Sequence, residues 1–244
     1  MTNVPQTSER RVIAWQRGPS APQLAQDHVH IWSVWLDSVS HLSDWCETLL
    51  SPDERVRAER FRRDVDRRQF VMTRGVLRAL LARYIGRGPG DVRFRYGLDG
   101  KPALHPCIGS RLRFNLSHAA SVALYAIGQD RDVGIDVEPL SPDTRDRRTR
   151  LEKWTHMEAY VKARGTSLAG FIDATHHAPI DVDAVARRQG WICEDVPLPG
   201  CVAVVAVQGA GWVANHWSLD ATWLAASRRK GRAGTRSDTS VQSI

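Results

Sequence analysis

The sequence predicts an α+β protein, because segments with the period of a helix occur along the chain together with segments that alternate like strands. An apolar run at 121–127 resembles a second apolar run at 201–207, and this similarity hints at two related lobes. The length of 244 residues leaves one large domain and two half-sized lobes both open.

Strands are predicted where apolar and polar residues alternate, or where a short apolar run stands by itself. These segments are 28–35, 92–96, 111–116, 121–127, 132–138 and 201–207. In the first strand, His28 and His30 share one face and could in principle bind a metal, but a half-exposed strand start is the favoured interpretation. Asp99 and Gly100 form a dipeptide that is typical of a tight turn.

Helices are predicted at 52–61, 64–85 and 154–164. Ser51 is suited to cap the first helix, and Gly86 and Gly165 are suited to end the other two. The polar segment 139–153 contains two prolines and predicts a connector. The segments 1–27 and 227–244 are small and polar, and we expect them to be poorly ordered.

The net charge is +7 and the isoelectric point is near 9.7, which implies anionic partners without saying which. The four cysteines, Cys46, Cys107, Cys193 and Cys201, form no C-x-x-C pair and no zinc spacing with the histidines, which indicates free thiols in a reducing compartment. No signal-like N-terminus and no apolar run of about 18 residues occurs. We therefore expect a cytoplasmic protein with no membrane partner.

Asp136 and Glu138 lie two residues apart, so a strand would direct both carboxylates to one face and Ile135 and Val137 to the core, with Gly134 leaving room. Two adjacent carboxylates repel each other unless a cation lies between them, and oxygen ligands of this kind suit Mg²⁺. The alternative is a strand end whose acids are simply exposed.

Glu158 and Lys162 have the spacing of a stabilising helix pair, and Thr155 and Glu158 have the spacing of a capping box. Either structural role accounts for Glu158 without a catalytic or metal-binding function. The same spacing would also bring a metal ligand and a phosphate-binding cation side by side.

Ser117 and His118 follow the strand segment in which Leu112, Phe114 and Leu116 are expected to point inward. A lone histidine is more often structural, but the position at the end of a strand also fits a site. Arginines cluster in the two preceding helices, either as a solvated face or as a phosphate cradle; they include Arg57, Arg60, Arg62, Arg63, Arg67, Arg68 and Arg74.

Four motifs follow one another in the chain: Gly100-Lys101-Pro102, then 114–118 (Phe-Asn-Leu-Ser-His), then 134–138 (Gly-Ile-Asp-Val-Glu), then 154–162 (Trp-Thr-His-Met-Glu-Ala-Tyr-Val-Lys). In this order and spacing the chain resembles the 4'-phosphopantetheinyl transferases, and within them the longer, two-lobed type that activates nonribosomal peptide and polyketide synthases. The resemblance extends from about Ser51 to Leu168, and more loosely to Val207. It implies two similar α+β lobes that form a pseudo-dimer, at 28–127 and 128–226, with coenzyme A between them in a monomer.

The resemblance also implies an activity: Mg²⁺-dependent transfer of 4'-phosphopantetheine from coenzyme A to a serine of an acyl or peptidyl carrier protein, with release of adenosine 3',5'-bisphosphate. The positions that match its metal ligands are Asp136, Glu138 and Glu158. Those that match its coenzyme A contacts are Arg57, Arg74, Lys101, Ser117, His118 and Lys162. Those that match catalytic positions are Glu158, Lys162 and His118, with Glu158 as the base or as the group that orients it.

Two features depart from the family pattern. Met157 stands where the helix motif normally has a lysine, and His156 beside it is a candidate to supply part of that charge. The connector 139–153 is also short. These features leave open an impaired coenzyme A-binding or carrier-binding protein of the same fold. A basic nucleic-acid-binding protein is a further alternative, but the chain contains no recognised nucleic-acid module, so we expect no nucleic-acid partner.

Overall fold

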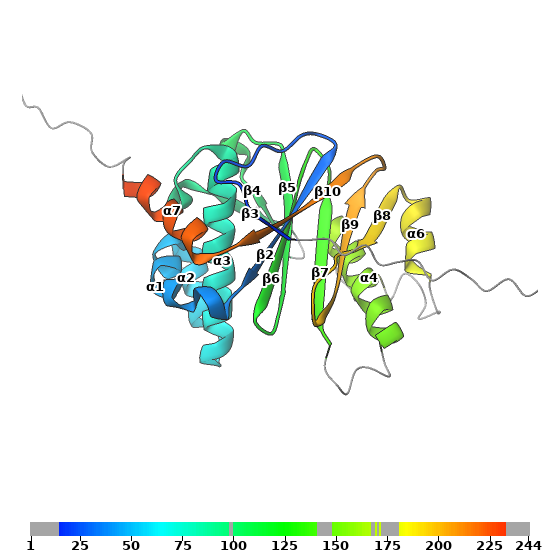
Figure 1. Ribbon diagram of the computed structural model, residues 1–244, viewed down its shortest axis with the longest axis horizontal. Coiled ribbons are helices and arrows are strands. Elements are labelled where there is room, and N and C mark those ends of the chain that lie inside the picture. Colours follow the sequence, from blue (N-terminus) through cyan, green and yellow to red (C-terminus); the bar gives the residue numbers. More distant parts are fainter. Residues whose placement is uncertain are drawn as a thin grey trace, which may run out of the picture.

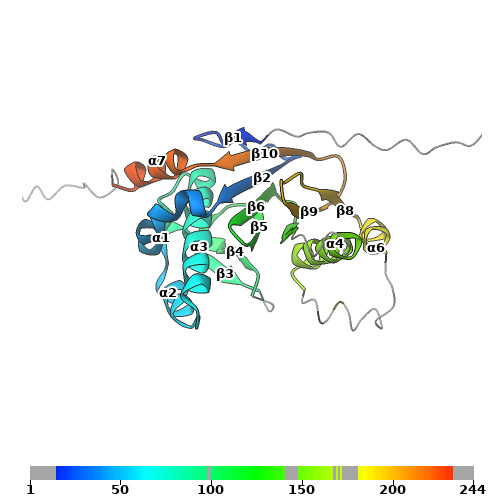
Figure 2. The same cartoon turned by 60° about the horizontal axis from the view of Figure 1, so that its bottom comes forward.

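Two β-sheets pack against each other in the middle of the molecule, and helices cover the outer face of each sheet (Figures 1 and 2). This computed structural model describes residues 15–97, 100–140, 148–166, 169, 171 and 181–232, with the backbone alone for 228–232. The predicted α+β class is confirmed. Within the described residues, no helix is both long enough and apolar enough to span a membrane.

The first sheet has the strand order β1-β10-β2-β6-β5, and β10 runs parallel to both of its neighbours. Its strands are β1 (Gln16–Arg17), β2 (His28–Trp35), β5 (Leu112–Ala119), β6 (Val122–Gln129) and β10 (Val213–Leu219). The helices on its outer face are α1 (Ser43–Leu49), α2 (Pro52–Glu59), α3 (Asp64–Ile85) and α7 (Ala221–Arg232). A two-stranded ribbon of β3 (Phe94–Tyr96) and β4 (Pro102–Leu104) and short 3₁₀ turns at Asp37–Leu42, Pro89–Asp91 and Pro106–Ile108 complete this lobe.

The second sheet is antiparallel, with the strand order β7-β9-β8. Its strands are β7 (Val133–Pro139), β8 (Trp191–Asp195) and β9 (Cys201–Gln208), and its helices are α4 (Arg148–Arg164) and α6 (Val182–Arg188). Helix α4 packs on β7 and β9, with the ring of Tyr160 in the core between them. Each sheet therefore carries its own helical layer, as expected for two lobes of similar design.

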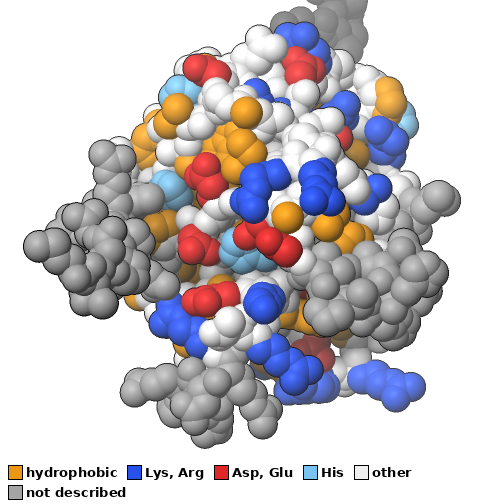
Figure 3. All heavy atoms as spheres, turned by 90° about the vertical axis from the view of Figure 1, so that its right-hand side faces the viewer, with side chains coloured by type: hydrophobic (Ala, Val, Ile, Leu, Met, Phe, Trp, Pro, Cys, Tyr) orange, Lys and Arg blue, Asp and Glu red, His pale blue; other side chains and the backbone are white. Residues whose placement is uncertain are grey.

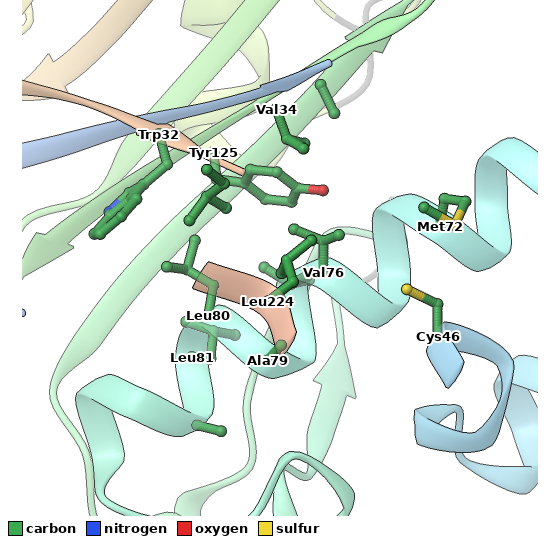
Figure 4. Packing of buried hydrophobic residues seen from close by; sticks show 14 of the residues in the cluster. Trp32, Val34, Cys46, Met72, Val76, Ala79, Leu80, Leu81, Tyr125 and Leu224 are labelled. Atoms are coloured by element: carbon green, nitrogen blue, oxygen red, sulfur yellow. The ribbon is translucent and has the colours of Figure 1, made fainter. Parts of the chain in front are cut away.

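Strand β2 is buried on both faces because it lies between two layers. Trp32 and Val34 face helix α3 and belong to the core shown in Figure 4. Val29 and Ile31 face the second sheet and pack in a separate core with residues such as Ile135. The alternation that the sequence predicts is therefore present, with apolar contacts on both sides of the strand.

His30 is only 4% exposed, so the predicted half-exposed strand start is wrong for this residue. Its Nδ1 lies 2.7 Å from the hydroxyl of Tyr84 on α3, which covers this face of the sheet. His28 is less buried, and its Nδ1 lies 2.6 Å from Oδ1 of Asn215 on β10. His28 thus has its partner in the sheet, and His30 has its partner on the helix that covers the sheet.

Helices α2 and α3 agree with the sequence prediction. The Ser51 amide donates to the Glu54 carboxylate at 3.0 Å, as in a capping box, and α2 ends at Glu59, two residues before the predicted end. Helix α3 has the predicted bounds, and Gly86 ends it with a left-handed φ of 65°.

Helix α4 begins at Arg148, so the prediction that it starts near Trp154 is wrong. Arg148 pairs with Glu152 one turn later, with Nε and Oε1 2.8 Å apart, and the last part of the predicted connector is therefore helical. Thr155 lies inside the helix and donates its hydroxyl to the Leu151 carbonyl at 2.8 Å instead of capping it. The remaining connector residues 141–147 lie outside the described part of the chain.

Both ends of the described chain belong to the first lobe. Strand β1 pairs with β10 inside the segment 1–27 that was expected to be poorly ordered, and α7 continues to Arg232, beyond the predicted start of disorder at 227. Strand β10 and the first half of α7 also fall within the predicted second lobe, 128–226, yet they pack on the first sheet. A boundary drawn along the sequence therefore does not separate the two lobes in space.

Candidate functional site

The two lobes meet where β5 of the first sheet lies beside β7 of the second. The buried side chain of Asn115 joins them, because its Oδ1 accepts the backbone N–H of Ile135 at 2.9 Å. Asn115 has no predicted role, since the alternation in this strand marks its apolar neighbours Phe114 and Leu116. The sequence signal that marks it is the polar series Arg113, Asn115 and Ser117 at every second position of the strand, of which Asn115 and Ser117 are buried.

Gly134 brings helix α4 close to β7. A Cβ at this position would lie 2.1 Å from the carbonyl oxygen of Ala159 and 2.3 Å from the amide nitrogen of Ala163. Both atoms belong to the helix backbone, so only glycine permits this approach. The close contact carries Glu158 and Lys162, whose spacing predicts that they lie side by side on α4, to the face of β7 on which Asp136 lies.

Asp136 is the most buried carboxylate of the site, with 2% of its surface exposed. Its Oδ1 accepts hydrogen bonds from Ser117 Oγ at 2.9 Å and from Lys162 Nζ at 2.5 Å. Its Oδ2 is buried and has no hydrogen-bond partner among the described residues. A buried carboxylate oxygen without a partner is costly, and a bound cation is one way to satisfy it.

Glu138 and Glu158 extend this carboxylate group. Burial raises the pKa of Glu138, as do the negative charges of Asp136 and Glu158, whereas Lys162 and a hydrogen bond from Trp154 lower it. Glu158 Oε2 lies 3.6 Å from Lys162 Nζ.

Three carboxylates thus share one ammonium group, which leaves an excess of negative charge and hard oxygen ligands. This donor set fits a divalent cation such as Mg²⁺.

Ser117 and His118 are adjacent on β5 and point to different neighbours. Ser117 is buried and lies between Asp136 and Lys162, whose Nζ is 3.3 Å from its Oγ. His118 lines a neighbouring hollow of about 360 Å³. Burial and, to a lesser extent, the charge of Lys162 lower the pKa of His118, so the imidazole is neutral at pH 7.

Arg57 and Arg74 line the same hollow as His118. The Arg57 guanidinium lies over the ring of Phe70 at 5.4 Å, and its side chain comes from the exposed face of α2. Arg74 is buried: its Nε lies 3.5 Å from Glu54, and its Nη1 has no hydrogen-bond partner in the described part of the chain. The hollow therefore offers two cations and an imidazole to an anion.

Lys101 is separated from this hollow, although Gly100 and Pro102 on either side of it line the hollow. Its Nζ donates to the backbone carbonyls of Val133 at 3.1 Å and Ala163 at 2.9 Å. Burial lowers its pKa to about 8. The structure thus places the Lys101 ammonium as a clamp between β7 and α4, and its predicted contact with coenzyme A stays a prediction.

His156 and Met157 point away from the carboxylates. Met157 packs against the outer core of the second lobe, and His156 lies between Asp183 and Asp195. Hydrogen bonds to Asp195, Cys193 and Asp183 raise the pKa of His156 to about 11. The expectation that His156 supplies the charge of the missing lysine is therefore wrong, because its ring is held on the opposite side of the helix.

Fold and site together define a class of protein: two α+β lobes with oxygen ligands and cationic side chains at their junction, a combination suited to phosphate-ester chemistry. A family model described as "4'-phosphopantetheinyl transferase, N-terminal" matches residues 22–129. The chain is also 36% identical to the 4'-phosphopantetheinyl transferase HetI of Nostoc sp. over 231 residues, which cover 83% of this chain and 97% of that protein. The chain belongs to the 4'-phosphopantetheinyl transferase family.

Two further relatives are more distant. A putative 4'-phosphopantetheinyl transferase of Synechocystis sp., slr0495, is 29% identical over 148 residues, which cover 51% of this chain and 60% of that protein. The 4'-phosphopantetheinyl transferase AcpT of Escherichia coli O157:H7 is 27% identical over 157 residues, which cover 54% of this chain and 78% of AcpT. The resemblance found in the sequence is confirmed, and the protein is a phosphopantetheinyl transferase in this general sense.

Proposed function

We propose that this protein transfers 4'-phosphopantetheine from coenzyme A to a serine of an acyl or peptidyl carrier protein, in a reaction that requires Mg²⁺ and releases adenosine 3',5'-bisphosphate. The observation that carries the proposal is the buried, unpartnered Oδ2 of Asp136 within a group of three carboxylates and Lys162. Family membership supplies the type of group that is transferred.

In this reaction the serine oxygen bonds to the β-phosphorus of coenzyme A, and the bond from that phosphorus to the oxygen that bridges to the α-phosphate breaks. Asp136, Glu138 and Glu158 would hold Mg²⁺, which when bound neutralises the pyrophosphate and the charge of the leaving group. The serine loses its proton to a base, and Glu158 is our candidate because it is a carboxylate at the edge of the group, beside Lys162.

The cations bind and orient the substrate. Lys162, which already bridges Asp136 and Glu158, can move its ammonium between these carboxylates and a phosphate oxygen. Neutral His118 can donate one N–H to a phosphate oxygen without carrying charge. Arg57 and Arg74 border the same hollow and are suited to the phosphates at the nucleotide end.

The carrier protein is the expected macromolecular partner. Such carriers are typically acidic, and the net charge of +7 on this chain would favour their approach. We further propose that the enzyme acts as a cytoplasmic monomer and has no nucleic-acid partner.

Mass spectrometry of a panel of apo carrier proteins tests the proposal. After incubation with coenzyme A, Mg²⁺ and this protein, we expect at least one carrier to gain the mass of a phosphopantetheine group. Asp136→Asn should abolish this gain and weaken Mg²⁺ binding in calorimetry. Asp132→Asn is the matched control, because Asp132 directly precedes β7, which carries Asp136, but its side chain is half exposed and pairs at 3.6 Å with Arg113. No mass gain on any carrier of a broad panel would refute the activity.

Met157 favours one alternative, a protein that binds coenzyme A or a carrier without turnover. The comparison of wild type with Met157→Lys separates the two. Mass gain that appears with Met157→Lys alone would show that the natural protein is impaired, whereas equal rates would remove the alternative.

A further inference from the structure

A second group of metal-ligating side chains lies on the side of α4 that faces away from the proposed active site. His156 of α4, Asp183 of α6 and Cys193 of β8 each offer one ligand atom, and these atoms all lie within 4.8 Å of one another. Figure 3 views the molecule from the side of α4, α6 and β8, and shows a histidine surrounded by acidic side chains on this face. The three residues are far apart in the sequence, so spacing rules for zinc motifs do not find them.

The contacts of His156 give the ring a defined orientation. Its Nδ1 lies 2.8 Å from Asp183 Oδ1, and its Nε2 lies 3.2 Å from Asp195 Oδ1. Metal-bound histidines usually donate their second ring N–H to a carboxylate or a carbonyl, which fixes the tautomer and the ring plane. Asp195 is placed to receive that N–H, and Nδ1 is then directed at Asp183.

The donor types indicate the kind of metal. A thiol, an imidazole and a carboxylate are the three side chains that bind Zn²⁺, whereas Mg²⁺ takes oxygen ligands. Tetrahedral bonds of about 2.0–2.3 Å place ligand atoms roughly 3.3–3.8 Å apart. The observed separations, from 2.8 Å to at most 4.8 Å, require side-chain adjustments of the order of 1 Å.

We propose that His156, Asp183 and Cys193 bind a zinc ion, with Asp195 as the hydrogen-bond acceptor that orients the histidine. The fourth position would face the open cleft between α4 and α6, which Thr149, Lys153 and Asp181 help to line and from which a water molecule can enter. On binding, the thiol and the imidazole Nδ1 each release the proton they carry to solvent, and no other bond changes.

The position of this site gives it a structural consequence. The zinc ion would join the helices α4 and α6, which form the outer layer of the second lobe, to β8, the edge strand of its sheet. His156 lies two residues before Glu158 on the same helix, so the ion would fix the helix that carries the proposed catalytic side chains. The site itself does not depend on the proposed function, because its ligands are separate from Asp136, Glu138 and Glu158.

The test uses the untagged full-length protein after removal of bound metal. Equilibrium dialysis against Zn²⁺ followed by elemental analysis should give one tightly bound zinc per chain. With Co²⁺ as the probe, the wild type should show the near-ultraviolet charge-transfer band of a cobalt–thiolate bond. Cys193→Ser should remove this band and weaken Zn²⁺ binding at least tenfold. Cys201→Ser is the matched control, since this thiol on β9 is outside the cluster, and it should leave both readouts unchanged.

A second variant protects the test against misfolding. Asp183→Asn removes a ligand from a partly exposed position and should weaken Zn²⁺ binding while the circular dichroism of the metal-free protein stays the same. Asp136→Asn should bind zinc like the wild type, which separates this site from the proposed Mg²⁺ site. No zinc above background would show that His156 makes ion pairs only, and a cobalt band that persists in Cys193→Ser would show that another thiol binds the metal. Either result would overturn the proposal.

Discussion

Replacing Gly134 by alanine tests whether the close approach of α4 to β7 builds the site. The new Cβ would stand 2.1 Å from the Ala159 carbonyl oxygen, and ordinary contact begins near 3.4 Å. Because the obstructing atoms are backbone, the helix must retreat by about 1.3 Å, the difference between these two distances. Overpacking of this kind costs about 1–3 kcal/mol of the free energy of unfolding.

The same displacement should disturb the site more than it disturbs the fold. Glu158 and Lys162 lie on the helix that moves, whereas Asp136 stays on the strand. A misplacement of about 1 Å can lower a rate by roughly 10²-fold. We therefore expect Gly134→Ala to lose about 1–3 kcal/mol in urea unfolding, to bind Mg²⁺ more weakly in calorimetry, and to modify carriers far more slowly in the mass assay.

Gly90→Ala is the control for this experiment. An added Cβ at Gly90 meets no atom within 4 Å, so its free energy of unfolding should stay within about 0.5 kcal/mol of the wild type. If Gly134→Ala matches the wild type in unfolding and in Mg²⁺ affinity, the argument that helix contact at Gly134 positions the site is refuted.

Three further changes test the fold around the site. Burial and, to a lesser extent, the charge of His28 lower the pKa of His30 to about 4, below its ordinary value of 6.5. The neutral ring therefore contributes fully to the free energy of unfolding above pH 6.5, and this contribution is lost as the pH falls toward 4. Between pH 7 and pH 5, the free energy of unfolding from urea titrations should fall by about 2 kcal/mol more in the wild type than in His30→Gln. Equal decreases in the two proteins would contradict this prediction. Arg78→Met leaves the buried Glu54 carboxylate without its 2.6 Å partner and should cost about 3–5 kcal/mol, measured against a wild-type unfolding curve. Lys101→Met leaves the two carbonyls that Lys101 bonds unsatisfied, so the free energy of unfolding should fall by about 1–3 kcal/mol while the KM for coenzyme A stays unchanged. A raised KM with an unchanged free energy of unfolding would favour a phosphate contact instead.

Sequence periodicity and capping residues predicted a helix correctly where both indicate the same boundaries. Helix α3 has its predicted bounds because its apolar period and the glycine at its end agree. The prediction for α4 was wrong at its start, since the capping-box spacing at Thr155 also occurs inside a longer helix. Local sequence could not distinguish the two, because an arginine-rich polar segment serves equally as a connector and as a solvated helical turn.

The motif residues of the site were recognisable from order and spacing, whereas their partners were not. Period 2 on a strand puts Asp136 and Glu138 on one face, and period 4 on a helix puts Glu158 beside Lys162. The packing of α4 on β7 then places Lys162 between Asp136 and Glu158. The contact of Asn115 with β7 and the clamp formed by Lys101 depend on which strands lie side by side. That is a property of the packed lobes.

The sequence by itself determined the α+β class, the family and the local pairs Asp136–Glu138 and Glu158–Lys162, because these follow from local periodicity and from the order of motifs along the chain. Only the tertiary structure decided that the C-terminal strand β10 and helix α7 return to the first lobe, and that His156 faces Asp183 and Cys193. Both depend on contacts between residues far apart in the sequence. Such contacts form where burial of apolar layers brings distant segments together, and no local pattern records them.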